Sequence, residues 1–113
     1  MSDPLFPTNT GALGKHRRDL TPDATKAFEA FSQAVFADGA LDTKTKQLIA
    51  VAVAHVTQCP YCIKGHTKAA LRHKASEAEI MEAIWVAAEM RAGGAYAHSV
   101  LALDEMQKAA DKD

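Results

Sequence analysis

The sequence predicts an all-α fold, and three observations support this prediction. Alanine, the residue with the highest helix propensity, contributes 23 of the 113 residues. Aromatic residues, which favour strands, make up only 6% of the chain. Apolar residues also recur at spacings of three and four, which is typical of helices with one buried face. The length suits a single domain of about five helices.

The N-terminal part of the chain is expected to differ from the rest. Residues 1–20 contain two prolines and two glycines and show little periodicity, so we expect an irregular arm. The helical domain is predicted to comprise residues 21–113. Its first helix begins at Thr21, an N-cap residue followed by Pro22, and ends at Asp38-Gly39. We expect one face of this helix to be buried, through Ala24, Ala27, Phe28, Phe31 and Val35.

Two further helices are predicted in the middle of the chain. The first begins after Asp42, which can cap it, and continues to about Val56. Its apolar residues point around most of its circumference, so we expect it to be central. The next helix begins at Cys59-Pro60, because proline is disfavoured inside a helix but fits its first turn. It is expected to end at about His73.

The last part of the sequence predicts two helices. Ser76 and Glu79 form a capping-box pair at the start of the first one. Its inner face is predicted to carry Ile80, Ala83, Ile84, Ala87 and Ala88. Gly93-Gly94 is expected to interrupt or bend it. The last helix then begins at about Ala95 and carries Leu101, Leu103 and Met106.

The charge balance excludes two kinds of partner. Lysine and arginine number 13 and aspartate and glutamate 14, for a net charge of −1. This balance provides neither a basic field for nucleic acid nor a polybasic run for an anionic membrane surface. No apolar stretch reaches the ~20 residues of a membrane-spanning helix, and residues 1–10 lack the features of a signal peptide. We therefore expect no nucleic acid, no membrane and a cytoplasmic location.

The composition also predicts self-association. Small alanine side chains fill little core volume, so a domain of this size is a candidate for completing its core as a homo-oligomer. Trp85, Met90 and Tyr96 recur at helical spacing and are predicted to lie in the core or in a subunit interface.

The segment most informative about chemistry is Cys59-Pro60-Tyr61-Cys62-Ile63-Lys64-Gly65-His66. In a reducing compartment, a Cys-x-x-Cys pair indicates a redox or metal site more readily than a structural disulfide. Thiols at a helix start are exposed to unpaired backbone N–H groups, which favour the thiolate. His66 lies one turn beyond Cys62 and can move a proton to or from it, while Cys59 can form a disulfide with it. The segment therefore predicts a dithiol redox unit.

Two other interpretations of this segment remain open. The Cys-x-x-Cys pair can be incidental, with His66 an ordinary surface histidine. Alternatively, Cys59, Cys62 and His66 could bind zinc together with His55 or His98. Structural zinc sites usually take paired ligands from separate elements, and the sequence has no second pair of this kind. We therefore expect no metal.

The segment Leu41–Ala50, joined to the Cys-x-x-Cys-x-x-x-His pattern, resembles the carboxymuconolactone decarboxylase family, specifically its alkylhydroperoxidase D-like branch. The motif of that branch is a Glu, eleven residues, Cys-x-x-Cys, three residues and a His. The resemblance covers roughly Gly39 to His98. It implies an antiparallel helical bundle assembled as a trimer or a hexamer, and an antioxidant peroxidase activity.

The resemblance also implies roles for individual residues in a thiol-dependent hydroperoxide reductase. Cys62 would be the peroxidatic thiolate, Cys59 the resolving thiol and proton donor, and His66 part of the proton relay. No cofactor is implied. An external dithiol would restore the thiols, and a lipoyl-bearing protein serves this purpose in one branch of the family. The helix dipole alone would instead make Cys59 the more acidic thiol, because it lies nearer the helix start.

One residue departs from the motif, because Gln47 occupies the position of the Glu. Glutamine cannot accept and release a proton. Our hypothesis is that His55, two turns further along the same helix face, replaces the carboxylate, while Gln47 remains as a hydrogen-bonding residue. A buried, hydrogen-bonded core position is the alternative for His55. His98 is a weaker candidate for the relay, and His16 and His73 are predicted to be solvated.

Two other functions follow from the same residues. A redox-sensing or thiol-exchange protein with little turnover is the first, because the missing carboxylate can slow catalysis. A carboxymuconolactone-type decarboxylase is the second. It is less favoured, because such enzymes are not expected to need the paired thiols of Cys59 and Cys62.

Overall fold

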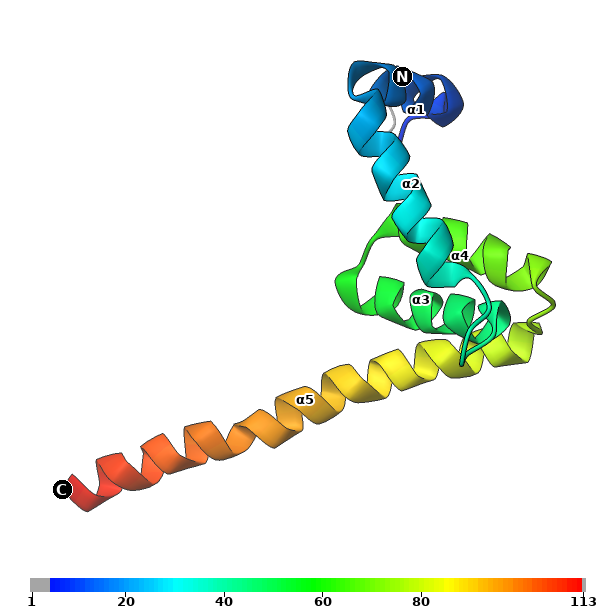
Figure 1. Ribbon diagram of the computed structural model, residues 1–113. Coiled ribbons are helices and arrows are strands. Elements are labelled where there is room, and N and C mark those ends of the chain that lie inside the picture. The colour runs from blue at the N-terminus through cyan, green and yellow to red at the C-terminus, as the bar shows by residue number, and fades with distance from the viewer. Residues whose placement is uncertain (1–4, 113) are drawn as a thin grey trace. The chain divides into compact units, whose positions relative to one another are not determined.

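The computed structural model describes residues 5–112, and within this range it contains five α-helices and no strand (Figure 1). The prediction of an all-α fold is therefore confirmed. The helices are α1 (Thr10–Leu20), α2 (Pro22–Phe36), α3 (Thr43–Thr57), α4 (Pro60–Arg72) and α5 (Glu77–Lys112). The chain divides into two compact units, one ending at Ala37 and the other beginning at Asp38.

The first unit contains α1 and α2. The expectation of an irregular arm is wrong for residues 10–20, which form α1, and residues 1–4 of that arm lie outside the described residues. Gly11 and Gly14 lie inside α1, because a helical glycine costs only about 1 kcal/mol and does not by itself end a helix. An ion pair between Lys15 and Asp19, one turn apart at 2.7 Å, adds a small local contribution.

α2 begins at Pro22 as predicted, but its apolar face is not buried. Phe28 is 67% exposed and Phe31 is 63% exposed. Their rings contact each other, with centroids 6.3 Å apart. The prediction of a buried stripe on this helix is therefore wrong for this chain, because periodicity identifies an apolar face and not what covers it.

α3 is the central helix of the second unit, as predicted, and packs against both α4 and α5 (Figure 1). The core of this unit gathers side chains from all three helices and from the α4–α5 connection. Its buried members are Val51, Ala70, Ala75 and Ile80, with Leu48 and Ile84 packed against them. The outer face of α3 is less buried than its sequence predicts, since Ile49 and Val53 are half exposed.

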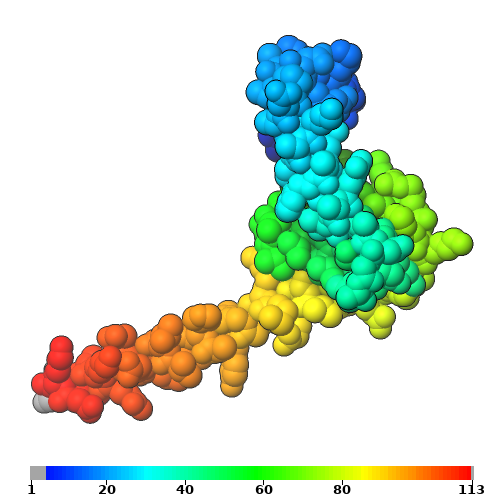
Figure 2. All heavy atoms as spheres, in the orientation of Figure 1, coloured from blue at the N-terminus to red at the C-terminus, as the bar shows by residue number. Residues whose placement is uncertain are grey.

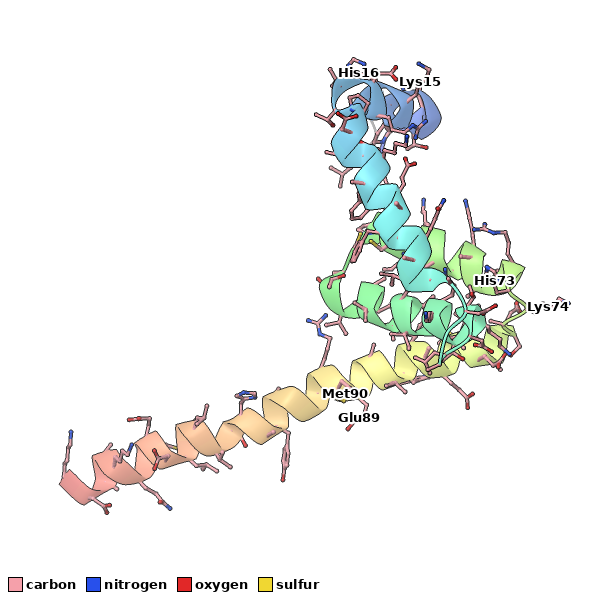
Figure 3. All side chains as sticks on the ribbon, in the orientation of Figure 1. Lys15, His16, His73, Lys74, Glu89 and Met90 are labelled. Atoms are coloured by element: carbon pink, nitrogen blue, oxygen red, sulfur yellow. The ribbon has the colours of Figure 1, made fainter. Side chains whose placement is uncertain are left out.

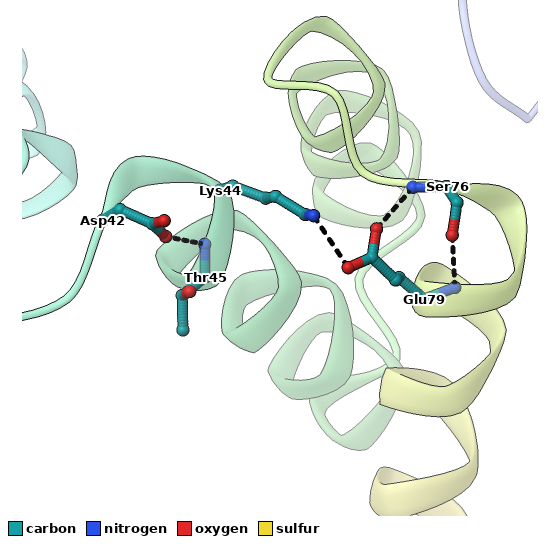
Figure 4. A network of polar contacts seen from close by, with 5 residues as sticks. All are labelled: Asp42, Lys44, Thr45, Ser76 and Glu79. Carbon is teal, nitrogen blue, oxygen red and sulfur yellow. Dashed lines mark hydrogen bonds and ion pairs between the residues drawn. The ribbon is translucent and has the colours of Figure 1, made fainter.

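Side-chain caps fix the starts of α3 and α5 (Figure 4). Asp42 accepts a hydrogen bond from the Thr45 N–H at 2.8 Å. Ser76 and Glu79 form the predicted capping box, with backbone-to-side-chain distances of 2.8 and 3.0 Å. The Lys44 ammonium lies 2.7 Å from Glu79 and links α3 to α5. The pKa of Glu79 is lowered, first by Lys44 and then by the Ser76 N–H.

α5 is one continuous helix of 36 residues. The expected interruption at Gly93-Gly94 is therefore wrong, and the two predicted C-terminal helices are one. Neither glycine adopts a positive φ, so each only weakens the helix by about 1 kcal/mol. Every residue from Ala95 to Lys112 is exposed. In Figure 2 this orange-to-red part of α5 stands clear of α3 and α4.

Candidate active site

The two cysteines lie at the start of α4, where the sequence predicts them. Cys59 is the N-cap residue, and Pro60 occupies the first turn. The Cys59 sulfur accepts a hydrogen bond from the Cys62 N–H at 3.3 Å. Both cysteines are free thiols and partly buried. One turn of helix thus brings two reduced sulfurs to the same helix end.

The two thiols have opposite pKa shifts. Hydrogen bonds from the thiol and the backbone N–H of Cys62 lower the pKa of Cys59. The pKa of Cys62 is raised, first because its thiol donates to Cys59 and then because it is buried. Cys59 is therefore the more acidic thiol of the pair, as the helix dipole predicts.

His66 is connected to α3 by a hydrogen bond with Gln47. Nδ1 of His66 lies 2.8 Å from Oε1 of Gln47, across a separation of nineteen residues. An amide oxygen can only accept, so Nδ1 carries the hydrogen and Nε2 is the basic ring nitrogen. Gln47 is only 7% exposed, so its amide is held firmly by the surrounding core. The residue at the motif's Glu position therefore orients the imidazole ring.

The other histidines make different contacts. His55 is partly buried and donates from Nδ1 to the carbonyl of Val51 at 2.7 Å, within α3. His98 is exposed and donates from Nδ1 to the carbonyl of Gly94 at 2.7 Å, within α5. The hydrogen bonds described for these two side chains thus stay within their own helices, and a relay role for either stays a prediction. His16 and His73 are exposed as predicted (Figure 3).

A groove that the sequence analysis missed lies where α5 passes the end of α3. Its volume is about 440 Å³, and its lining residues are Val56, Met90, Arg91, Gly94, Ala95 and His98. Arg91 donates to the carbonyl of Val56 at a long distance of 3.5 Å. A sequence signal for the groove exists, because Arg91 and His98 are seven residues apart and thus share one face of a helix.

Two further findings concern residues 5–112. This range contains no group of three or more cysteine, histidine, aspartate or glutamate side chains arranged to hold a metal ion. No helix in the same range has the length and apolar character needed to cross a membrane.

The family comparison covers most of the chain. Residues 22–105 match the model of the carboxymuconolactone decarboxylase family. The match includes both cysteines, His66, Gln47 and the groove.

Individual relatives extend this similarity. Uncharacterized protein 4 in the cox locus of Paracoccus denitrificans is 61% identical over 103 residues, which span 91% of this chain and 92% of that protein. The crystal structure of apo-lpg0406, a carboxymuconolactone decarboxylase family protein of Legionella pneumophila, is 35% identical, covers 88% of both chains and has a TM-score of 0.68. A family member from Thermotoga maritima, for which a part in the antioxidative response has been suggested, is 30% identical with a TM-score of 0.54. It covers 76% of this chain and 95% of that one.

Proposed function

The chain belongs to the carboxymuconolactone decarboxylase family, and from this premise we propose that it is a thiol-dependent hydroperoxide reductase. One arrangement carries the proposal. Two free thiols with opposite pKa shifts lie at the start of α4, and the same helix carries, one turn beyond Cys62, a histidine whose tautomer is set by Gln47. The antioxidative role suggested for the Thermotoga maritima relative is consistent with this chemistry.

The shared hydrogen bond between the sulfurs supports a first step at Cys62. The Cys59 thiolate takes the proton from the Cys62 thiol that donates to it. The resulting Cys62 thiolate attacks the distal oxygen of the hydroperoxide, the O–O bond breaks, and Cys62 becomes a sulfenic acid. The departing alkoxide takes the proton from Cys59 and leaves as an alcohol. Cys59 is thereby a thiolate again.

The second step closes the disulfide. The Cys59 thiolate attacks the sulfenic sulfur of Cys62, and hydroxide leaves. His66, protonated when it first deprotonated the thiol pair, returns that proton so that water is released. An external dithiol then reduces the disulfide by thiol–disulfide exchange. A lipoyl group on a partner protein has the slender dithiol arm that such an exchange requires.

The test is the rate and stoichiometry of thiol loss. The reduced chain is mixed with cumene hydroperoxide in a stopped-flow instrument, and the remaining thiols are counted. We expect both thiols to disappear together and mass spectrometry to find a disulfide between Cys59 and Cys62. Cys59→Ser should stop at a sulfenic acid on Cys62 that dimedone traps. Two unmodified thiols after peroxide treatment would overturn the proposal.

A second candidate function is redox sensing or thiol exchange with little turnover. Gln47 favours it, because an amide cannot carry protons as the motif's carboxylate can. The same mixing experiment separates the two functions. A sensor would lose its thiols slowly with peroxide alone and would show no sustained peroxide consumption when a lipoyl dithiol is supplied.

A further inference from the structure

The groove between α5 and the end of α3 has the size and composition of a site for a small organic molecule. Its volume of about 440 Å³ falls within the range of roughly 300–1,000 Å³ that is typical of such sites. Apolar groups form most of its wall. Val56 and Met90 line it and are 45% and 64% exposed, so a ligand in the groove would cover both side chains. The wall therefore suits the hydrocarbon part of a ligand.

Arg91 supplies the one permanent cation among the residues that line the groove. Within residues 5–112 it forms no ion pair. Its described hydrogen bond to the Val56 carbonyl, at 3.5 Å, is longer than the usual N–H···O distance of about 2.7–3.2 Å. A guanidinium group has five N–H donors, so this contact leaves most of them for a ligand.

The polar groups of the groove favour a single carboxylate. A guanidinium group binds a carboxylate through two parallel hydrogen bonds. His98 donates from Nδ1 to the Gly94 carbonyl at 2.7 Å, so its neutral ring offers a ligand only the accepting nitrogen Nε2. The lining residues of α5 lie well inside that helix, so their backbone N–H groups are bonded within it. A phosphate, which needs more donors than one arginine provides, is therefore a poorer fit.

The groove lies close to the thiols. Cys59 follows Val56 by three residues, and its N–H donates to the Ala54 carbonyl in the last turn of α3 at 3.2 Å. Because consecutive Cα atoms are about 3.8 Å apart, the Cα atoms of Val56 and Cys59 are separated by at most ~11 Å. One aromatic ring or a short alkyl chain between two functional groups bridges a gap of this order.

We propose that the groove binds the carboxylate end of an apolar organic acid, so that the preferred substrates of the chain are hydroperoxides of such acids. The substrate preference rests on the proposed function. Arg91 holds the carboxylate, Val56 and Met90 cover the hydrocarbon part, and the peroxide reaches the thiols at the start of α4. The two thiols are oxidised to a disulfide, and the O–O bond is reduced to give a hydroxy acid and water. Arg91 thus determines specificity and takes no part in the bond changes.

Turnover of a matched pair of peroxides tests the preference. Cumene hydroperoxide and its para-carboxylate differ only in the charged group, and a lipoyl dithiol reduces the chain in both assays. We expect the KM of the para-carboxylate to be about tenfold lower with a similar kcat, because the ion pair with Arg91 forms on binding and is unchanged in the reaction. Arg91→Gln should make the two KM values equal. Arg72→Gln is the control, because it removes an exposed arginine at the far end of α4, and it should keep the preference.

A binding measurement tests the groove without any redox chemistry. The full-length chain with Cys59→Ser and Cys62→Ser is titrated with 4-isopropylbenzoate, which has the ring and the carboxylate but no peroxide. We expect the NMR signals of the Val56 and Met90 methyl groups to shift. The affinity should fall by about tenfold in Arg91→Gln and by a similar factor for the neutral ligand 4-isopropylbenzamide. Circular dichroism checks that each variant remains helical.

The two experiments separate failure of this proposal from failure of the proposed function. Methyl signals that do not shift, or that shift equally with the benzoate and the benzamide, would overturn the carboxylate site. Equal KM values for the two peroxides in the native chain would overturn the substrate preference. Binding of the benzoate that depends on Arg91, together with no turnover of either peroxide, would support the carboxylate site and refute the peroxidase function.

Discussion

Replacing Gln47 by leucine would remove the amide that orients His66 while keeping a side chain of similar size in its buried site. The lost hydrogen bond to His66, 2.8 Å long, contributes about 1 kcal/mol net. Burying an apolar side chain in place of the 7% exposed amide recovers roughly the same amount. We therefore expect the free energy of unfolding to change by less than about 1 kcal/mol, so that the variant remains folded.

The effect on chemistry should be larger than the effect on stability. A correctly placed acid or base contributes about 10²- to 10⁴-fold to a rate. Without the Gln47 oxygen, the hydrogen bond that holds the His66 hydrogen on Nδ1 is lost, and the ring can rotate or change tautomer. We expect the peroxide-driven oxidation of the cysteines to slow by about ten- to a hundredfold, which is part of that contribution.

Stopped-flow oxidation with cumene hydroperoxide measures this rate, and nitrogen NMR of the imidazole reports which ring nitrogen carries the hydrogen. Gln33→Leu on α2 is the matched control, because it introduces the same side chain at an exposed position. A Gln47→Leu chain that reacts at the native rate with the hydrogen still on Nδ1 would refute the reasoning. Equal slowing in Gln33→Leu would show that the effect is not local to the site.

Three further predictions concern the thiols and the stability of the second unit. Iodoacetamide at graded pH should modify Cys59 before Cys62, because the lower pKa of Cys59 gives it more thiolate. Fragment mass spectrometry gives the order of modification. Modification of Cys62 before Cys59 would contradict this prediction. Glu79 has a pKa below its ordinary 4.5 in the folded chain because of Lys44, so the stabilisation it provides is present above pH 4.5 and is lost as the pH falls through the lower folded value. In urea unfolding, the stability difference between the native chain and Glu79→Gln should therefore shrink below pH 4.5, and a constant difference would contradict the ion pair. Gly65→Ala should raise the free energy of unfolding by about 0.5–1 kcal/mol, because the added Cβ meets nothing within 4 Å and glycine weakens a helix interior; a lower melting temperature would refute this.

The sequence was most informative about helix starts, because a capping residue and the helix end that it caps lie within one short segment. Asp42 caps the helix that it precedes, and Ser76 and Glu79 cap each other three residues apart. The start of α4 is equally local, because Pro60 fits only a first turn. These helix starts could be predicted to within a residue for that reason.

The sequence was less informative where a small local preference competes with its surroundings. Gly93 and Gly94 predict an interruption, yet the preference of each against helix is about 1 kcal/mol and the neighbouring residues are strong helix formers. The same small preference explains why residues 10–20 form α1 although Gly11 and Gly14 lie within it. Burial of a helix face is harder still to predict, because the apolar period of α2 identifies an apolar face but not the element that covers that face.

The candidate site likewise has features that the sequence predicts and features that depend on how the helices pack. The spacing of Cys59, Cys62 and His66 along one helix start could be read directly from the sequence. The hydrogen bond from His66 to Gln47 could not, because it depends on how α3 packs against α4. Arg91 was missed because its significance arises only from the groove that α5 forms with the end of α3.

The amide of Gln47 also affects which residues accept and which donate a proton in the proposed reaction. A carboxylate at this position would give a protonated imidazole an ion-pair partner, whereas an amide oxygen carries no charge and only fixes the hydrogen on Nδ1. In the proposed reaction His66 therefore accepts a proton from the thiol pair at Nε2 and returns it only to the hydroxide that leaves in the second step. The proton for the departing alkoxide must then come from the second thiol. The hydrogen bond between the sulfurs of Cys62 and Cys59 supplies the route, because it lets one thiol become the nucleophile as the other becomes the acid.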